Sequence, residues 1–123
     1  MELQEIHKEM LALCAHDYLG FWLVVKRVAK DAYSDTLPEW VRPKTLEAIR
    51  YLLQSGLIEA GNFEHEDSGS YKFQPMLLPV DEVIRYIERE WDELGRTPNI
   101  SDICWFIATS LGKQLANDLG LRA

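Results

Sequence analysis

The side chains of this sequence best suited to chemistry are three histidines, two cysteines and several groups of carboxylates. Cys14 and His16 are separated by a single residue, and His65 is followed directly by Glu66 and Asp67. A structural zinc site takes four ligands, which usually arrive as two spaced pairs. Neither group has a matching pair elsewhere in the chain. We therefore expect no metal site and no cofactor.

No catalytic arrangement is recognisable in the sequence. It contains no nucleophile elbow, no glycine-rich phosphate loop and no zincin helix, so we expect that the protein is not an enzyme. An enzyme that used His16 or His65 would need a pocket, which a sequence cannot show. Cys14 and Cys104 both lie in apolar stretches, which favours two buried free thiols over a disulfide.

The composition indicates one domain with an acidic surface. The 123 residues are 47% hydrophobic, and the net charge is -7. Residues 1–60 hold seven Lys/Arg and nine Asp/Glu, a net of -2, whereas residues 61–123 hold six and eleven, a net of -5. Acidic charge repels phosphate backbones and attracts basic partners, although it also serves solubility alone. No apolar run approaches the roughly 20 residues that span a bilayer, and the acidic N-terminus is unlike a signal peptide. We expect a cytoplasmic protein that makes no contact with membranes.

The apolar spacing predicts about five helices and one central hairpin. Helices are expected over residues 3–15, 17–33, 43–55 and 80–94. A last helix is expected to bury Ile103, Ile107, Leu111 and Leu115 and to end before Gly120. Two strands, the first beginning at Leu57, are expected on either side of a polar turn at 64–70. The predicted class is mainly α (α+β), with 1–123 as one domain.

Residues 42–75 resemble a winged-helix unit. They read as a helix that Gly56 stops, followed by a strand, a turn and a second strand. The resemblance implies a winged-helix-like unit over 1–75 and a C-terminal helical extension over 76–123. It also implies DNA binding through the basic side chains of the third helix, Arg42, Lys44 and Arg50. The expected wing tip is acidic, however, which opposes contact with phosphates. A basic patch around Lys26, Arg27, Lys30, Arg42 and Lys44 keeps that alternative open.

The stretch from Glu90 to Phe106 is a second point of resemblance. It looks like a C-terminal signature of small bacterial proteins, and the whole chain is similar to immunity proteins of contact-dependent growth inhibition and related toxin systems. This resemblance implies a protein that binds one toxin domain and neutralises it. The toxin is expected to be a nuclease with a basic site, which an acidic partner occupies as a substrate mimic. A structural reading of the stretch, in which Trp91, Ile103 and Phe106 pack the last two helices together, is the alternative.

The leading hypothesis is therefore an immunity protein with a basic protein toxin as its partner and no affinity for nucleic acid. The other hypothesis is a winged-helix transcription regulator. The sequence leaves the oligomeric state open. The predicted contact surface joins the acidic turn to the charged face of the fourth helix, with two tryptophans as candidate anchors. Its residues are Glu64, Glu66, Asp67, Glu82, Glu88, Asp92, Glu93, Trp40 and Trp105.

Overall fold

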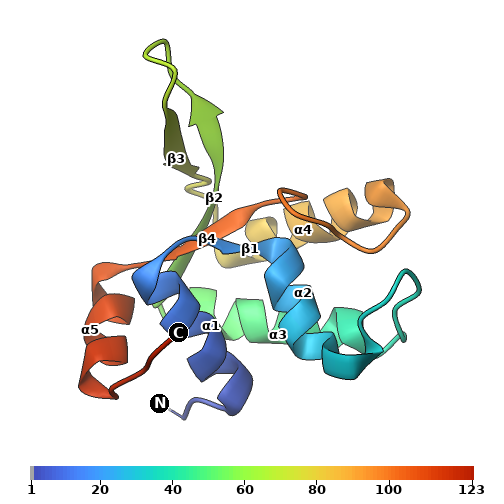
Figure 1. Ribbon diagram of the computed structural model, residues 1–123, viewed down its shortest axis with the longest axis horizontal. Coiled ribbons are helices and arrows are strands. Elements are labelled where there is room, and N and C mark those ends of the chain that lie inside the picture. The colour runs from blue at the N-terminus through green and yellow to red at the C-terminus, as the bar shows by residue number, and fades with distance from the viewer. Residues whose placement is uncertain (1) are drawn as a thin grey trace.

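A computed structural model describes residues 2–123 and shows an α+β fold (Figure 1). The helices are α1 (Glu5–His16), α2 (Phe21–Ala29), the 3-10 helix η1 (Lys30–Ala32), α3 (Val41–Gln54), α4 (Val80–Leu94) and α5 (Ser110–Asp118). The strands are β1 (Leu19–Gly20), β2 (Ile58–His65), β3 (Tyr71–Pro75) and β4 (Trp105–Ala108). The five α-helices and the central antiparallel hairpin confirm the predicted fold class.

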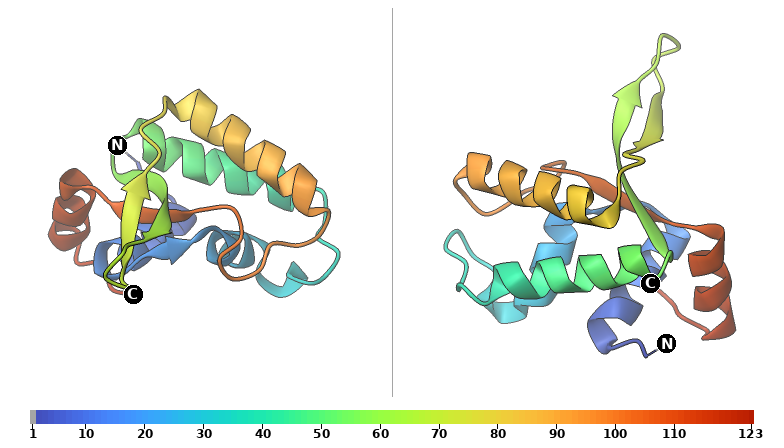
Figure 2. Two further views of the ribbon diagram at one scale, coloured as in Figure 1. Left: turned by 90° about the horizontal axis from the view of Figure 1, so that it is seen from above. Right: turned by 180° about the vertical axis from the view of Figure 1, so that it is seen from behind.

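The first part of the chain has the element order of a winged helix. α1, β1, α2 and α3 are followed by the β2–β3 hairpin. α3 ends where Gly56 adopts a left-handed conformation (φ +71°), which glycine tolerates because it has no Cβ. The hairpin then projects well beyond the helices (Figures 1 and 2).

The sheet is larger than expected, because a strand from the end of the chain lies in its middle. All pairings are antiparallel and the order is β1-β4-β2-β3. The prediction of a last helix that buries Ile103 and Ile107 is wrong. From Cys104 to Ala108, buried and half-buried side chains alternate, which is the period of a strand. The helix starts only at Ser110, and Leu111 is exposed. The region 76–123 is therefore not a purely helical extension.

The core lies between one face of the sheet and the helices. Phe106 is paired across the sheet with both Leu19 and Ala60, and all three side chains are buried. Met10 of α1 and Ile49 of α3 are fully buried in the same cluster. Because alternate residues of a strand point to opposite faces, the neighbours of these residues lie on the other face of the sheet. That second face carries the candidate functional site.

Candidate functional site

One face of the hairpin carries a row of aromatic rings. The cross-strand pairs Phe63 with Phe73 and His65 with Tyr71 lie two residues apart along β2 and β3, so all four side chains share a face. Gly61 occupies the next position on this face toward the base of the hairpin. It pairs with Trp105 of β4, whose ring lies on the same face. We call the six rings on this face the aromatic stripe: Tyr18, Phe63, His65, Tyr71, Phe73 and Trp105.

Four rings of the aromatic stripe contact one another around Phe63, and His65 and Tyr71 form a separate pair with ring centroids 5.2 Å apart. The Phe63 centroid lies 4.7 Å from Tyr18, 5.8 Å from Phe73 and 5.4 Å from Trp105, each in edge-to-face geometry. Such pairs add roughly 0.5–1.5 kcal/mol beyond the area they bury. The stripe nevertheless stays open to solvent, because Tyr71 is 69% and Tyr18 is 46% exposed. A hollow of about 500 Å³ lies beside Phe63, Tyr71 and Trp105.

Gly61 leaves room for the Phe73 ring and for the backbone of β3. A Cβ at this position would be 2.3 Å from the Gln74 carbonyl oxygen and 2.6 Å from the Phe73 ring. Both separations are far inside van der Waals contact. A larger residue would displace Phe73 or open the hairpin, so the glycine positions the lower part of the stripe.

The hairpin ends in the acidic tip, defined as Glu64, Glu66 and Asp67. Glu64 lies near the end of β2, and Glu66 and Asp67 follow this strand in the turn. All three are exposed, and within residues 2–123 none of them makes an ion pair. The turn is closed by the Glu66 N–H, which donates to the Ser70 carbonyl oxygen at 2.7 Å. Glu66 and Asp67 therefore offer negative charge next to the outermost rings of the stripe, whereas Glu64 lies on the other face of β2, across from Lys72.

The predicted acids of α4 belong to a different part of the surface. α4 runs antiparallel to α3, and Arg42 donates to the Asp92 carboxylate at 2.7 Å and to the Glu88 carbonyl oxygen at 3.2 Å. At the other end of the pair of helices, Arg50 is bonded to Asp81, and this guanidinium holds the pKa of that carboxyl below its ordinary value. Asp92 and the Glu88 backbone thus serve contacts within the chain.

The two remaining acids of the predicted set also lie on α4. Glu82 forms an ion pair with Arg85 one turn away, whereas Glu93 is exposed. α4 lies across the body of the protein, and the hairpin projects away from it (Figure 2). The structure therefore does not merge the α4 acids and the acidic tip into one surface.

The two candidate tryptophans are also far apart in the fold. Trp105 belongs to the aromatic stripe and is half-buried against Phe63. Trp40 precedes α3 and is 47% exposed, with the Lys44 ammonium 5.9 Å from its ring centroid. Only Trp105 is placed to act together with the hairpin.

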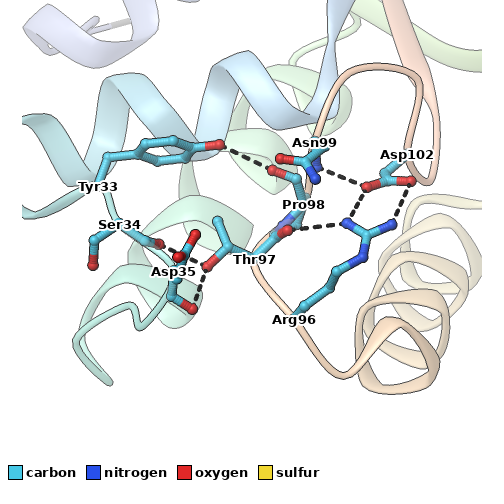
Figure 3. Close-up of polar contacts among 8 residues, drawn as sticks. All are labelled: Tyr33, Ser34, Asp35, Arg96, Thr97, Pro98, Asn99 and Asp102. Atoms are coloured by element: carbon cyan, nitrogen blue, oxygen red, sulfur yellow. Dashed lines mark hydrogen bonds and ion pairs between the residues drawn. The ribbon is translucent and has the colours of Figure 1, made fainter.

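The unusual stretch before β4 is a loop held by its own polar contacts (Figure 3). Arg96 donates to the Asp102 carboxylate at 2.7 Å, and this bond lowers the pKa of Asp102. The Thr97 hydroxyl donates to the Ser34 carbonyl oxygen at 2.8 Å, and the Tyr33 hydroxyl donates to the Pro98 carbonyl oxygen at 3.0 Å. These bonds fasten the loop to the segment after η1 and direct the chain into β4. The stretch therefore has a clear structural role.

Both cysteines and one of the three histidines are buried. His7 is buried and stacks on Tyr51 with a centroid distance of 4.4 Å. Burial raises the pKa of the Cys14 thiol to about 12, and Cys104 is shifted in the same direction. Both thiols are free and buried, as predicted. No group of three metal-ligating side chains occurs among residues 2–123.

The sequence interpretation missed the aromatic stripe as a unit. The alternation of Phe63 with His65 and of Tyr71 with Phe73 is visible in the sequence. Tyr18 and Trp105 join this row only through β1 and β4, and neither strand was predicted. The sequence interpretation named the exposed acids Glu64, Glu66 and Asp67 but not the rings of the same hairpin.

None of the helices formed by residues 2–123 is both long enough and apolar enough to cross a membrane. In comparisons with known proteins, no protein-family model, no curated protein and no solved structure matches the chain.

Proposed function

We propose that this chain is an immunity protein that acts in the cytoplasm, where its projecting hairpin binds a basic toxin domain of the nuclease class. The observation that carries the proposal is the combination of the acidic tip and the aromatic stripe on one hairpin. The three tip carboxylates have no internal partner among the described residues, and the neighbouring rings remain exposed. This is the composition expected of a protein-binding surface for a positively charged partner.

The two parts of the hairpin contribute differently to binding. Aromatic side chains dominate interface hot spots, and each one that becomes buried contributes roughly 1.5–3 kcal/mol. Exposed carboxylates contribute less to affinity, but they raise the association rate and select against acidic surfaces. Arginine suits both parts, because its guanidinium stacks on rings and pairs with carboxylates. A nuclease site rich in basic side chains is therefore a fitting target.

The contacts of α3 disfavour the alternative of a winged-helix DNA reader. Arg42 and Arg50, two of the three basic side chains of the expected recognition helix, are engaged by Asp92 and Asp81 of α4. α4 lies along α3 (Figure 2), so this side of α3 is not free to enter a groove of DNA. The acidic tip would in addition face phosphates. Lys44 remains exposed, but a single unpaired cation on the expected recognition helix gives this helix little affinity for phosphates.

The first experiment identifies the partner by its contact with the hairpin. A photo-crosslinking amino acid at position 71 is compared with the same group at Leu119, which is 50% exposed and directly follows α5. α5 lies away from the hairpin tip (Figure 1). We expect one protein to be captured only from position 71. That protein must stop growth when expressed alone and must be tolerated when co-expressed with this chain. A captured protein that leaves growth unchanged would contradict the immunity function.

The second experiment tests the surface by charge. The hairpin variant carries Glu64→Lys, Glu66→Lys and Asp67→Lys. Its binding to the purified toxin domain should fall by about 100-fold or more, because three attractive charges become repulsive. The affinity of the unchanged protein should weaken with added salt, and that of the variant should not weaken in the same way.

A control variant carries the same change in net charge at another place. It has Asp31→Lys, Asp35→Lys and Glu39→Lys, all of which are exposed in and after η1. We expect this control to bind and to protect cells as the unchanged protein does. Equal losses in both variants would show that net charge matters rather than the hairpin. Undiminished binding of the hairpin variant would refute the site.

A further inference from the structure

A second site lies at the junction of α1, α2 and the start of α3, away from the hairpin. A groove of about 490 Å³ opens there, a size within the usual range of sites for small molecules. Three elements line it with cations, namely Arg27 of α2, Lys30 of η1 and Lys44 of α3. We call this groove the basic groove.

The cations of the basic groove form no ion pairs within the described residues. Arg27, Lys30 and Lys44 are all exposed, and no ion pair in the described chain involves any of them. This is notable in a protein whose net charge is -7. Like charges around one hollow repel one another, and an anion placed between them relieves that repulsion. The cations come from α2, η1 and α3, whereas the two acids of the lining, Glu5 and Glu9, come from α1. An anionic group is therefore favoured at the cationic side of the groove.

Lys30 is held at the groove by an unusual backbone conformation. Its φ is +52°, a region that residues with a Cβ adopt at a cost of roughly 1–3 kcal/mol. The conformation coincides with the end of α2, where the chain turns into η1. Such backbone conformations cluster at functional sites, which supports a binding role for Lys30.

The other walls of the groove supply a flat apolar surface and hydrogen-bond acceptors. Trp40 is 47% exposed and lines the groove beside Lys44. Glu5 and Glu9 of α1 line it as well. An indole face stacks on planar rings, and carboxylates accept hydrogen bonds from sugar hydroxyls. A ligand that satisfies all three walls has a planar ring, hydroxyl groups and a polyanionic group.

We propose that the basic groove binds a free nucleotide, with its base against Trp40, its phosphates among Arg27, Lys30 and Lys44, and its ribose hydroxyls toward Glu5 or Glu9. A double helix fits less well, because its phosphates would meet the two glutamates. This site is independent of the hairpin and does not rest on the proposed immunity function.

The test is a titration of the full chain with ATP, followed by calorimetry and by the NMR signal of the Trp40 indole N–H. We expect that signal to shift, and we expect adenosine and inorganic phosphate to bind at least about tenfold more weakly than ATP, since each satisfies only part of the groove. Arg27→Ala and Lys44→Ala should each weaken ATP binding by about tenfold or more, because each removes a charge-assisted contact. Lys113→Ala removes an exposed lysine of α5 and should leave ATP binding unchanged.

A Trp40 pair separates stacking from charge. Trp40→Phe should retain binding within about threefold, whereas Trp40→Ala should lose about tenfold or more. No Trp40 shift at about 5 mM ATP would overturn the proposal. Equal affinity for inorganic phosphate would overturn the nucleotide assignment and leave an adventitious anion only. Tighter binding of a single-stranded or duplex oligonucleotide than of ATP would overturn it in favour of a nucleic-acid contact.

Discussion

Replacing Gly112 by alanine tests how closely α5 is packed on the sheet. A Cβ at this position would be 2.0 Å from the Leu57 carbonyl oxygen and 3.3 Å from the Leu11 side chain. The same carbonyl oxygen accepts the Thr109 N–H at 3.0 Å, and the Thr109 hydroxyl accepts the Gly112 N–H at 3.1 Å. Neither backbone segment can therefore retreat without loss of hydrogen bonds.

Two effects of opposite sign decide the result of this substitution. Alanine is favoured over glycine within a helix by about 1 kcal/mol. Overpacking against backbone costs typically about 1–3 kcal/mol, and each disturbed hydrogen bond costs about 1 kcal/mol more. We expect Gly112→Ala to lower the free energy of unfolding by about 2 kcal/mol. For a domain of this size, that corresponds to a fall in Tm of about 8 °C.

The assay is urea and thermal unfolding followed by circular dichroism. Lys113→Ala is the matched control, because Lys113 is the next residue of the same helix and is exposed. Its effect should stay within about 0.5 kcal/mol. If Gly112→Ala raised the stability by about 1 kcal/mol, helix propensity alone would explain it, and the close approach of α5 to Leu57 would be refuted.

Three further outcomes follow from the buried and paired titratable groups. Burial lowers the pKa of His7 from its ordinary value of 6.5, so the unfolded chain binds the proton better and the stability should fall as the pH drops through and below that value. His7→Gln should flatten this dependence in urea titrations, whereas His16→Gln, at an exposed position, should not. Asp102→Asn should cost about 1–2 kcal/mol at neutral pH through the weakened bond from Arg96. Since the pKa of Asp102 is lowered in the folded state, its contribution is present above the ordinary carboxyl pKa, and the cost should vanish as the pH falls through the folded pKa. The Cys14 thiol should stay unreactive toward a disulfide reagent until the protein is unfolded, because it is buried and its pKa is about 12.

Most of the helices and the hairpin were predictable because local patterns specify them. The apolar stripe of α3 predicts a helix, and the left-handed Gly56 after it marks where that helix ends. The alternation of Tyr71 and Phe73 specifies β3 in the same way. In each case the information lies within a few residues, where sequence patterns are most reliable.

The position of β4 was not predictable from such patterns. Ile103, Ile107, Leu111 and Leu115 have the spacing of a helix, while the burial of Phe106 requires a strand between β1 and β2. A four-residue strand gives a weak local signal, and its partners are distant in the sequence. Tertiary pairing therefore decides this segment.

The pairing of charges across helices was equally hidden. The sequence indicated only that Arg42 and Arg50 were available for phosphates. The antiparallel packing of α4 on α3 places Asp92 and Asp81 against them. Predicting this would have required the relative orientation of two helices that are separated by the whole hairpin.

The place of β4 between β1 and β2 also has a consequence for the order in which the protein folds. The segment up to β3 can form α1, α2, α3 and the hairpin, but β1 and β2 then lack the strand that joins them. During synthesis, the inner edges of both strands stay unpaired until residues 105–108 have emerged. Such distant contacts slow folding, and unpaired edges invite association with other chains. The winged-helix-like part is therefore completed by the chain's last strand.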